Sequence, residues 1–171
     1  MVSRNSQIPP AVVGALDKDG EIENITLNEE FAQGTYILVG VPGAYTPVCT
    51  ITHLPSLIKN AMEYLAMGVD GIYCISDDNP WTLKKWAGDI EGSEAVKFLS
   101  DRNRDFLEHC KIRNDLSDLF ISGRYGRFYM VIHNNKIIQM RAENSALDTT
   151  CTSGECILHD LEMTSLMTGN G

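Results

Sequence analysis

Apolar runs of strand length alternate with segments of helical periodicity along most of this chain. The mainly apolar runs at 36–41 and 69–76 predict buried strands. Two further runs, at 127–132 and 136–140, predict a hairpin across the short turn between them. Strands that alternate with helices and end in a hairpin indicate an α/β fold, in which helices flank a mixed central sheet.

The helix expected between the first two strands has an irregular beginning. Apolar residues recur there at helical spacing, and Pro55 interrupts their pattern, so we expect a kink or a broken first helix. Gly68 follows the pattern and is expected to end the helix. The apolar positions are Ile51, Leu54, Ile58, Met62 and Leu65.

Shorter signals predict the remaining elements. Asn79 and Pro80 are typical of a helix start. Trp81 and Trp86 within that helix are expected in the core or in an interface. The other expected elements are a turn over 17–20 between two short strands, a strand over 95–99, and helices over 103–110 and 155–166.

The excess of acidic over basic residues indicates which kinds of partner the protein can bind. The chain has 14 Lys and Arg residues against 23 Asp and Glu residues, and its formal net charge is −9. Such a surface repels phosphate backbones and anionic lipids, so we expect neither a nucleic-acid nor a membrane partner. No apolar segment approaches the roughly 20 residues that span a bilayer, and the first residues lack the apolar region of a signal peptide. The length suits a single domain covering 1–171.

The cysteine count favours redox chemistry. An odd number at wide spacing argues against the disulfide framework of a secreted protein, so we expect a cytoplasmic or organellar protein with reactive or buried thiols. The chain has no C-x-x-C pair, which disfavours a thiol–disulfide oxidoreductase. The five positions are Cys49, Cys74, Cys110, Cys151 and Cys156.

Cys49 stands where a predicted strand gives way to a helix. The carboxyl ends of strands in open α/β sheets are the usual place for a site, and the positive end of a helix favours a thiolate. Thr46 lies three residues earlier, so across a tight turn its hydroxyl can face the sulfur. Pro42 has no N–H and is placed to cover the apolar side of the site. These residues predict a reactive cysteine.

A positive charge near this sulfur has to come from elsewhere in the chain. Arg127 directly precedes an apolar run that is expected to lie near the first strand. Its guanidinium stays charged and offers several donors in a fixed fork. Arg124, three residues earlier, is the competing candidate.

Three other residues have simpler interpretations. His53, one helical turn after Cys49, suggests a general base, but an orienting or solvated histidine is favoured, because an activated thiolate needs no base. Cys74 lies within a strand run and is expected to be a buried, inert thiol. Cys110 is expected to be a thiol on a helix face without a catalytic role.

The sequence PGAYTPVC at 42–49, followed by HLP at 53–55, closely resembles the peroxidatic motif of the peroxiredoxins. It is most similar to the type-V, atypical two-Cys branch, whose motif is PGAFTPxCSxxHLP. The similarity continues through YCIS at 73–76, Trp86 and RFYMV at 127–131. It implies a thioredoxin-like fold and the reduction of hydrogen peroxide and organic hydroperoxides without a metal or organic cofactor.

The resemblance also implies a role for each matched residue. Cys49 would be the peroxidatic cysteine, which forms a sulfenic acid. Thr46 and Arg127 would polarise the peroxide, and Pro42 would shield the sulfur. A second thiol must then condense with the sulfenic acid before further peroxide over-oxidises it. The resemblance further implies a homodimer and a thiol reductant such as thioredoxin, glutaredoxin or glutathione.

Several thiols compete for that second role. Atypical two-Cys members carry the resolving cysteine near the C-terminus, and Cys151 lies in the corresponding region among small polar residues. Cys156 is the rival and could also pair with Cys151. A one-Cys enzyme recycled by an external thiol is the remaining alternative. Cys151, Cys156 and His159 form only half of a zinc-site pattern, so we expect no metal.

A functional alternative of a different class is a non-enzymatic redox sensor or partner-binding module. Such a protein would use Cys49 only as a switch. Thr46 and Arg127 favour catalysis, because a sensor needs a reactive thiol but no group that activates the oxidant. The sequence therefore predicts a thiol-dependent peroxidase.

Overall fold

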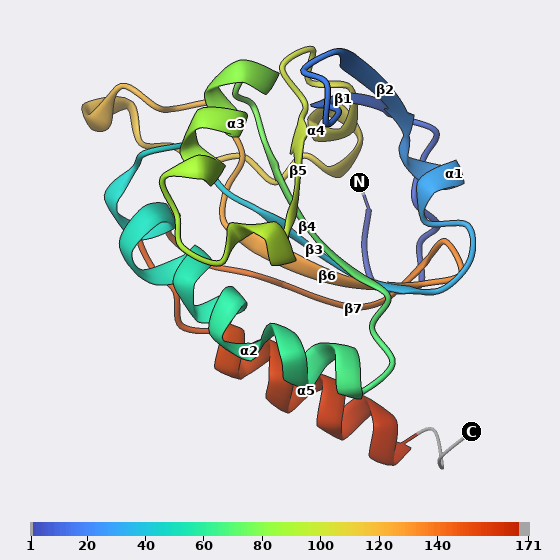
Figure 1. Ribbon diagram of the computed structural model, residues 1–171. Helices are drawn as coiled ribbons and strands as arrows, with labels where there is room; N and C mark the ends of the chain where they lie inside the picture. The colour runs from blue at the N-terminus through green and yellow to red at the C-terminus, as the bar shows by residue number, and fades with distance from the viewer. Residues whose placement is uncertain (1, 168–171) are drawn as a thin grey trace.

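A seven-stranded sheet runs through the middle of the molecule, for which the computed structural model describes residues 2–167 (Figure 1). Its strands, in spatial order, are β2 (Ile22–Thr26), β1 (Val12–Leu16), β5 (Lys97–Ser100), β4 (Gly71–Ser76), β3 (Thr35–Gly40), β6 (Phe128–His133) and β7 (Lys136–Ala142). β4 pairs in parallel with β3 and with β5, whereas the other neighbouring pairs are antiparallel. The predicted α/β fold with a mixed sheet is confirmed.

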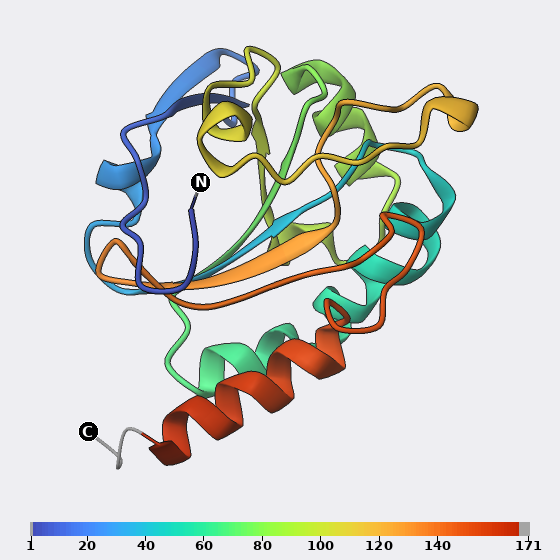
Figure 2. The same ribbon diagram turned by 180° about the vertical axis from the view of Figure 1, so that it is seen from behind.

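Helices cover both faces of the sheet. They are α1 (Leu27–Glu30), α2 (Leu54–Ala66), α3 (Pro80–Gly88), α4 (Asp105–Cys110) and α5 (Gly154–Met167), with 3₁₀ turns η2 (Ser93–Ala95) and η3 (Ser117–Leu119) and the π-helix η1 (Val48–His53). α2 and α5 run side by side on one face in both ribbon views (Figures 1 and 2). They share one apolar cluster with α3, whereas α1 and α4 belong to a second cluster on the other face.

The π-helix η1 leads directly into α2. The sequence predicted an irregularity at Pro55, but the irregular segment lies before the proline. Pro55 is the second residue of α2, where the absence of an N–H is tolerated. Hydrogen bonds in a π-helix join residues five apart rather than four. For this reason η1 rotates the residues that follow it about the helix axis, so that a different set of side chains faces the core.

The buried face of α2 differs from the apolar pattern that the sequence suggested. Leu54 is buried as that pattern requires, but Ile51 and Met62 are 74% and 77% exposed. The pattern is therefore wrong as a guide to the buried face. The buried residues of α2 after Leu54 are Leu57, Asn60, Ala61 and Tyr64.

The predicted helix ends agree closely with the structure. Gly68 follows α2 with φ +96°, a conformation that glycine adopts without strain. The side chain of Asn79 accepts a hydrogen bond from the Thr82 N–H at 2.9 Å and caps α3. Trp86 is buried as expected, but Trp81 is 60% exposed and lies outside the core.

The first turn of α5 is fixed against α2. The Gly154 N–H donates to Ser56 Oγ at 2.9 Å, and Tyr64 Oη donates to the Gly154 carbonyl at 2.6 Å. A Cβ atom on Gly154 would lie 2.1 Å from the Ser56 carbonyl oxygen, so this close approach requires glycine. The contact fixes the end of the loop that joins β7 to α5.

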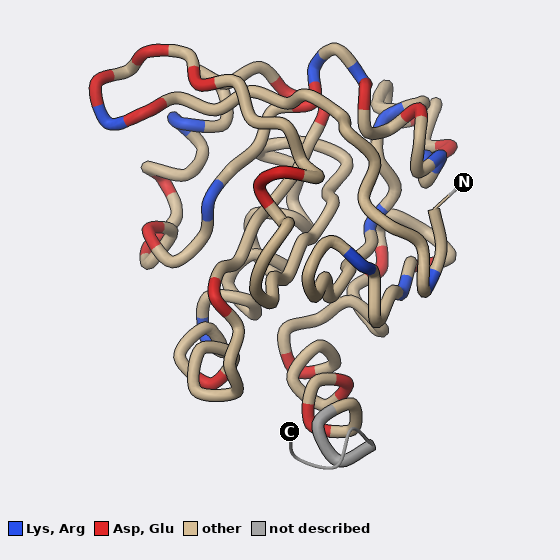
Figure 3. Tube along the Cα trace, turned by 90° about the vertical axis from the view of Figure 1, so that its right-hand side faces the viewer, with Lys and Arg blue, Asp and Glu red and all other residues tan. Residues whose placement is uncertain are grey.

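Charged residues of both signs are distributed along the described chain (Figure 3). The C-terminal helix is the exception, because 154–167 contains acidic residues and no Lys or Arg. No described helix has the length and apolar character that crossing a bilayer requires.

Candidate active site

Cys49 is the second residue of η1, and its side chain is fully buried. The loop that precedes η1 leaves the carboxyl end of β3, as the sequence predicted. Antiparallel pairing places Gly40, the last residue of β3, opposite Phe128, the first residue of β6. The loop before Cys49 therefore meets Arg127 at one edge of the sheet.

Arg127 is the cationic partner of the sulfur. It is buried, and its Nη2 donates to Cys49 Sγ at 3.1 Å. Nε and Nη2 also donate to the Ala146 carbonyl, at 3.1 and 2.9 Å. A fixed positive charge beside a sulfur favours its anionic form. The competing Arg124 lies beside the loop that precedes Cys49, but it pairs with Asp78 at 2.9 Å rather than with the sulfur.

His53 orients this arginine. Its Nδ1 lies 2.8 Å from Arg127 Nη1, and its Nε2 lies 2.9 Å from the Thr152 carbonyl oxygen. A guanidinium only donates, so Nδ1 accepts and the Nε2–H donates. Burial, together with the charge of Arg127, lowers the pKa of His53 to about 3, so the ring is neutral near pH 7. The orienting interpretation is confirmed, and the solvated one is wrong.

Thr46 and Pro42 line a small cavity beside the buried sulfur. The cavity has a volume of about 280 Å³ and is also lined by Arg127, which contacts Cys49. Thr46 Oγ1 donates to the Gly43 carbonyl at 2.8 Å, so its lone pairs remain available as acceptors. The rest of the lining is mainly apolar, from Pro47, Val48, Leu119, Ile121, Ala146 and Leu147. A small molecule held here would meet one hydroxyl and one guanidinium.

Asp78 holds the loop that carries Thr46, and sequence reasoning missed it. Its carboxylate accepts from the Ala44 N–H at 2.7 Å, from Ser76 Oγ at 2.9 Å and from Arg124 Nη1 at 2.9 Å. The available signal was its position just after β4, the strand that neighbours β3 in parallel. Polar residues at adjoining carboxyl ends of parallel strands share one edge of the sheet.

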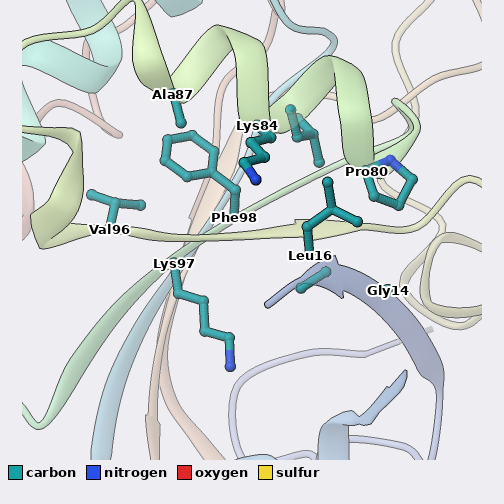
Figure 4. Close-up of a pocket in the computed structure, with 10 residues that line it drawn as sticks. Gly14, Leu16, Pro80, Lys84, Ala87, Val96, Lys97 and Phe98 are labelled. Carbon is teal, nitrogen blue, oxygen red and sulfur yellow. The ribbon is translucent and has the colours of Figure 1, made fainter. Parts of the chain in front are cut away.

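A second cavity lies between β1, α3 and β5 (Figure 4). It has a volume of about 250 Å³, and Lys84 and Lys97 are the charged residues of its lining. Apolar side chains such as Leu16 and Phe98 form most of the remainder. No residue that contacts Cys49 lines it. The cavity lined by Thr46 and Arg127 is therefore the better candidate for thiol chemistry.

Comparison with known proteins identifies the family. The Redoxin family model matches residues 4–151. Peroxiredoxin-2D of Arabidopsis thaliana is 30% identical, over 90% of this chain and 94% of the plant protein. The chain belongs to the peroxiredoxin family. Peroxisomal membrane associated protein 20 of Schizosaccharomyces pombe is another relative, 33% identical over 76% of this chain and 84% of its own length.

Solved peroxiredoxins share the fold. The crystal structure of reduced Prx3 in complex with hydrogen peroxide, from Vibrio vulnificus, matches with a TM-score of 0.87 and 28% identity, covering 94% of this chain and 99% of that one. The predicted thioredoxin-like fold and the predicted family are thus confirmed. The protein is a thiol-dependent peroxidase, and the alternative of a non-enzymatic sensor is not favoured.

In this peroxiredoxin, Cys151 lies in the loop between β7 and α5, close to the Arg127 network. It is half-buried, and its Sγ lies 3.5 Å from the Ala142 carbonyl oxygen. The next residue, Thr152, is the one whose carbonyl accepts from His53. Burial, followed by the charge of Glu143, raises the pKa of the Cys151 thiol to about 11. The reduced thiol is therefore protonated near pH 7.

The remaining cysteines lie in the elements that the sequence indicated. Cys74 is buried on β4, and its burial raises the pKa of the thiol well above its ordinary value. Cys110 is buried on α4, and burial raises its pKa to about 11. Cys156 is half-buried in the first turn of α5, where Ser153 Oγ accepts from its N–H at 3.2 Å. Within 2–167, no group of three or more His, Cys, Asp or Glu side chains is arranged to hold a metal ion.

Proposed function

We propose that Cys49 is the peroxidatic cysteine of this single-domain enzyme and reduces hydrogen peroxide and small organic hydroperoxides. The observation that carries the proposal is the 3.1 Å contact between Arg127 Nη2 and Cys49 Sγ, beside a cavity that Thr46 lines. The related Prx3 of Vibrio vulnificus, whose structure holds hydrogen peroxide, supports this substrate class.

The first chemical step oxidises the sulfur. The Cys49 thiolate attacks the terminal oxygen of the peroxide, an S–O bond forms, and the O–O bond breaks. The released oxygen takes up a proton and leaves as water or an alcohol, so that Cys49 becomes a sulfenic acid. Arg127 stabilises negative charge on the attacking sulfur and on the oxygens in this step.

Thr46 and Pro42 orient and shelter the oxidant. The hydroxyl hydrogen of Thr46 is engaged by the Gly43 carbonyl, so its oxygen accepts a hydrogen bond from the O–H of the peroxide. Pro42 lacks an N–H, and with the apolar lining of the cavity it limits the access of water to the sulfur. The apolar lining also suits the alkyl group of an organic hydroperoxide.

The second step forms a disulfide between Cys49 and Cys151. The Cys151 sulfur attacks the sulfenic sulfur, an S–S bond forms, and the S–O bond breaks with loss of water. Cys49 Sγ contacts Arg127 and Cys151 Sγ contacts the Ala142 carbonyl, so these contacts break when the two sulfurs come together to the Cα separation of about 7 Å or less that a disulfide needs. The position of Cys151, one residue from the partner of His53, supports this assignment over Cys156.

The reductant, assembly and location of the enzyme complete the proposal. Thioredoxin, glutaredoxin or glutathione returns the disulfide to two thiols. A homodimer is supported by apolar surface beside the active-site cavity, where Phe120 is 95% exposed and Leu119 and Leu147 are also exposed. Five free cysteines favour the reducing cytoplasm.

The direct test is the activity of Cys49→Ser with an external thiol reductant. We expect peroxide turnover to be lost, because the serine hydroxyl does not form the thiolate nucleophile. Cys110→Ala removes a buried thiol on α4, in the apolar cluster on the other face of the sheet, and should retain turnover, which makes it a matched control. Normal turnover by Cys49→Ser would overturn the assignment. Peptide mapping without reductant, after one equivalent of peroxide, identifies the partner of Cys49.

A further inference from the structure

The carboxylate of Glu143 anchors the loop that carries Cys151. Glu143 follows β7, and its side chain accepts three hydrogen bonds from the two residues that flank the cysteine. Thr150 Oγ1 donates at 2.8 Å, and the N–H and Oγ1 of Thr152 each donate at 2.9 Å. The loop is therefore held on both sides of Cys151 by one ionised group, and hydrogen bonds to charged groups are the stronger kind.

We propose that Glu143 is a positioning residue that keeps Cys151 in its reduced position and so limits the rate of disulfide formation with Cys49. The inference rests on the proposed role of Cys151 as the resolving cysteine. Glu143 lies outside the sequence motif around Cys49, and that motif gives it no role.

The contacts of the two sulfurs explain why the anchor slows the step. Cys49 Sγ is buried and contacts Arg127, whereas Cys151 Sγ contacts the Ala142 carbonyl at the end of β7. Cys151 has to leave that carbonyl before it reaches Cys49. Its two neighbours cannot follow without breaking their bonds to Glu143, so release of the carboxylate precedes the S–S bond.

The charge of Glu143 also slows the attack of Cys151 on Cys49, as its hydrogen bonds do. The titratable or charged groups that act on its thiol are Glu143 at the end of β7, Arg141 within β7 and Cys156 on α5. Burial is the largest cause of the raised pKa, the carboxylate of Glu143 is the next, and Arg141 opposes both. A thiol attacks through its thiolate. Glu143 thus lowers the reactive fraction of Cys151 as well as its freedom to move.

The step itself consumes nothing beyond the established reaction. The Cys151 thiol loses its proton, its sulfur forms the S–S bond to Cys49, and the sulfenic hydroxyl leaves with a proton as water. Cys49 is reduced from the sulfenic acid level and Cys151 is oxidised. Glu143 is unchanged. A slower step exposes the sulfenic acid to a second peroxide for longer, which favours over-oxidation.

The test compares Glu143→Gln and Glu143→Ala with the wild-type enzyme. Each protein is mixed with one equivalent of hydrogen peroxide, quenched with acid at intervals, and mapped for the Cys49–Cys151 disulfide. We expect the disulfide to form at least about five-fold faster at pH 7 in both variants. In Glu143→Gln, which preserves the shape of the side chain, the pH profile of this rate should also move to lower pH. A purely structural role would not move the profile.

Glu155→Gln is the matched control, because it removes the same charge from the exposed first turn of α5. It should form the disulfide at the wild-type rate. Wild-type or slower rates in both Glu143 variants would overturn the inference while leaving Cys151 as the resolving thiol. If the wild-type enzyme consumes peroxide through Cys49 but never forms the Cys49–Cys151 disulfide, the assignment of Cys151 and the inference fail together. If Cys49 does not react, the proposed function fails.

Discussion

Arg127 joins the sulfur to the rest of the site through one planar group. Its three nitrogens contact Cys49 Sγ, His53 Nδ1 and the Ala146 carbonyl at once. A guanidinium can satisfy three partners in fixed directions, whereas an ammonium is a single point of charge. The fixed directions of these hydrogen bonds therefore depend on arginine at this position.

Arg127→Lys tests this dependence. Lysine keeps the charge but cannot reach all three partners, so we expect the rate constant for the reaction with peroxide to fall about a hundred-fold. Stopped-flow tryptophan fluorescence measures it, because the Trp86 indole donates to Thr50 Oγ1 at 3.0 Å, next to Cys49. A rate within two-fold of the wild type would contradict the assigned role. Arg4→Lys serves as the control, because this exposed arginine donates to the Ile138 carbonyl and not to the site.

His53 makes the fold sensitive to acid. Its pKa of about 3 in the folded protein lies below the ordinary value of 6.5. Between these values the unfolded chain binds a proton that the folded protein does not bind, so stability falls as the pH decreases from about 6.5 towards 3. This contribution is fully present above pH 6.5.

His53→Gln should weaken the acid sensitivity. The amide oxygen can accept from Arg127 and the amide nitrogen can donate to the Thr152 carbonyl, but glutamine does not titrate. We expect the loss of unfolding free energy between pH 7 and pH 5 to be smaller in this variant, as measured by urea denaturation. An equal loss in both proteins would show that His53 does not titrate as described.

Single residues differ in how well the sequence predicted them. Cys49, Thr46 and Arg127 could be predicted together, because a local motif and a strand start place them. Asp78 and Glu143 could not, because Asp78 binds the N–H of Ala44 in a loop 34 residues earlier and Glu143 binds an irregular loop that has no sequence periodicity. Those contacts exist only after the sheet has assembled.

The packing of α5 on α2 depends on a close contact between their backbones, which the pattern of apolar residues does not reveal. α5 begins at Gly154, directly against Ser56 in α2, and the loop with Cys151 ends there. The end of α2 at Gly68 and the extent of α5 were predictable, but the start of α2 was not. The buried face of α2 was not, because the π-helix η1 shifts its phase and leaves Ile51 and Met62 exposed.

Gly154→Ala should separate α5 from α2. The new Cβ would lie 2.1 Å from the Ser56 carbonyl oxygen, so we expect a loss of about 2 kcal/mol in the free energy of unfolding. Gly88→Ala is the matched control, because no neighbouring atom lies within 4 Å of its added Cβ and alanine favours helix. Urea denaturation of both measures the difference. Equal stability of the two variants would refute the close contact.

The whole molecule brings three distant segments to one edge of the sheet. The loop after β3 carries Cys49, the residue before β6 is Arg127, and the loop after β7 carries Cys151. The alternation of strands and helices predicted the class of fold. The expected neighbourhood of β3 and β6 is present, but the full strand order could not be derived, because pairings such as that of β1 with β5 join residues far apart in sequence.

The order in which the cysteines react tests the account most directly. One equivalent of hydrogen peroxide is added to the reduced enzyme, sulfenic acid is trapped within the first turnover, and the modified cysteine is located by peptide mapping. We predict that the trapped oxygen is on Cys49 in the wild type, and that Cys151→Ser accumulates it there. Sulfenic acid found first on Cys151 or Cys156, with Cys49 unmodified, would contradict the central claim.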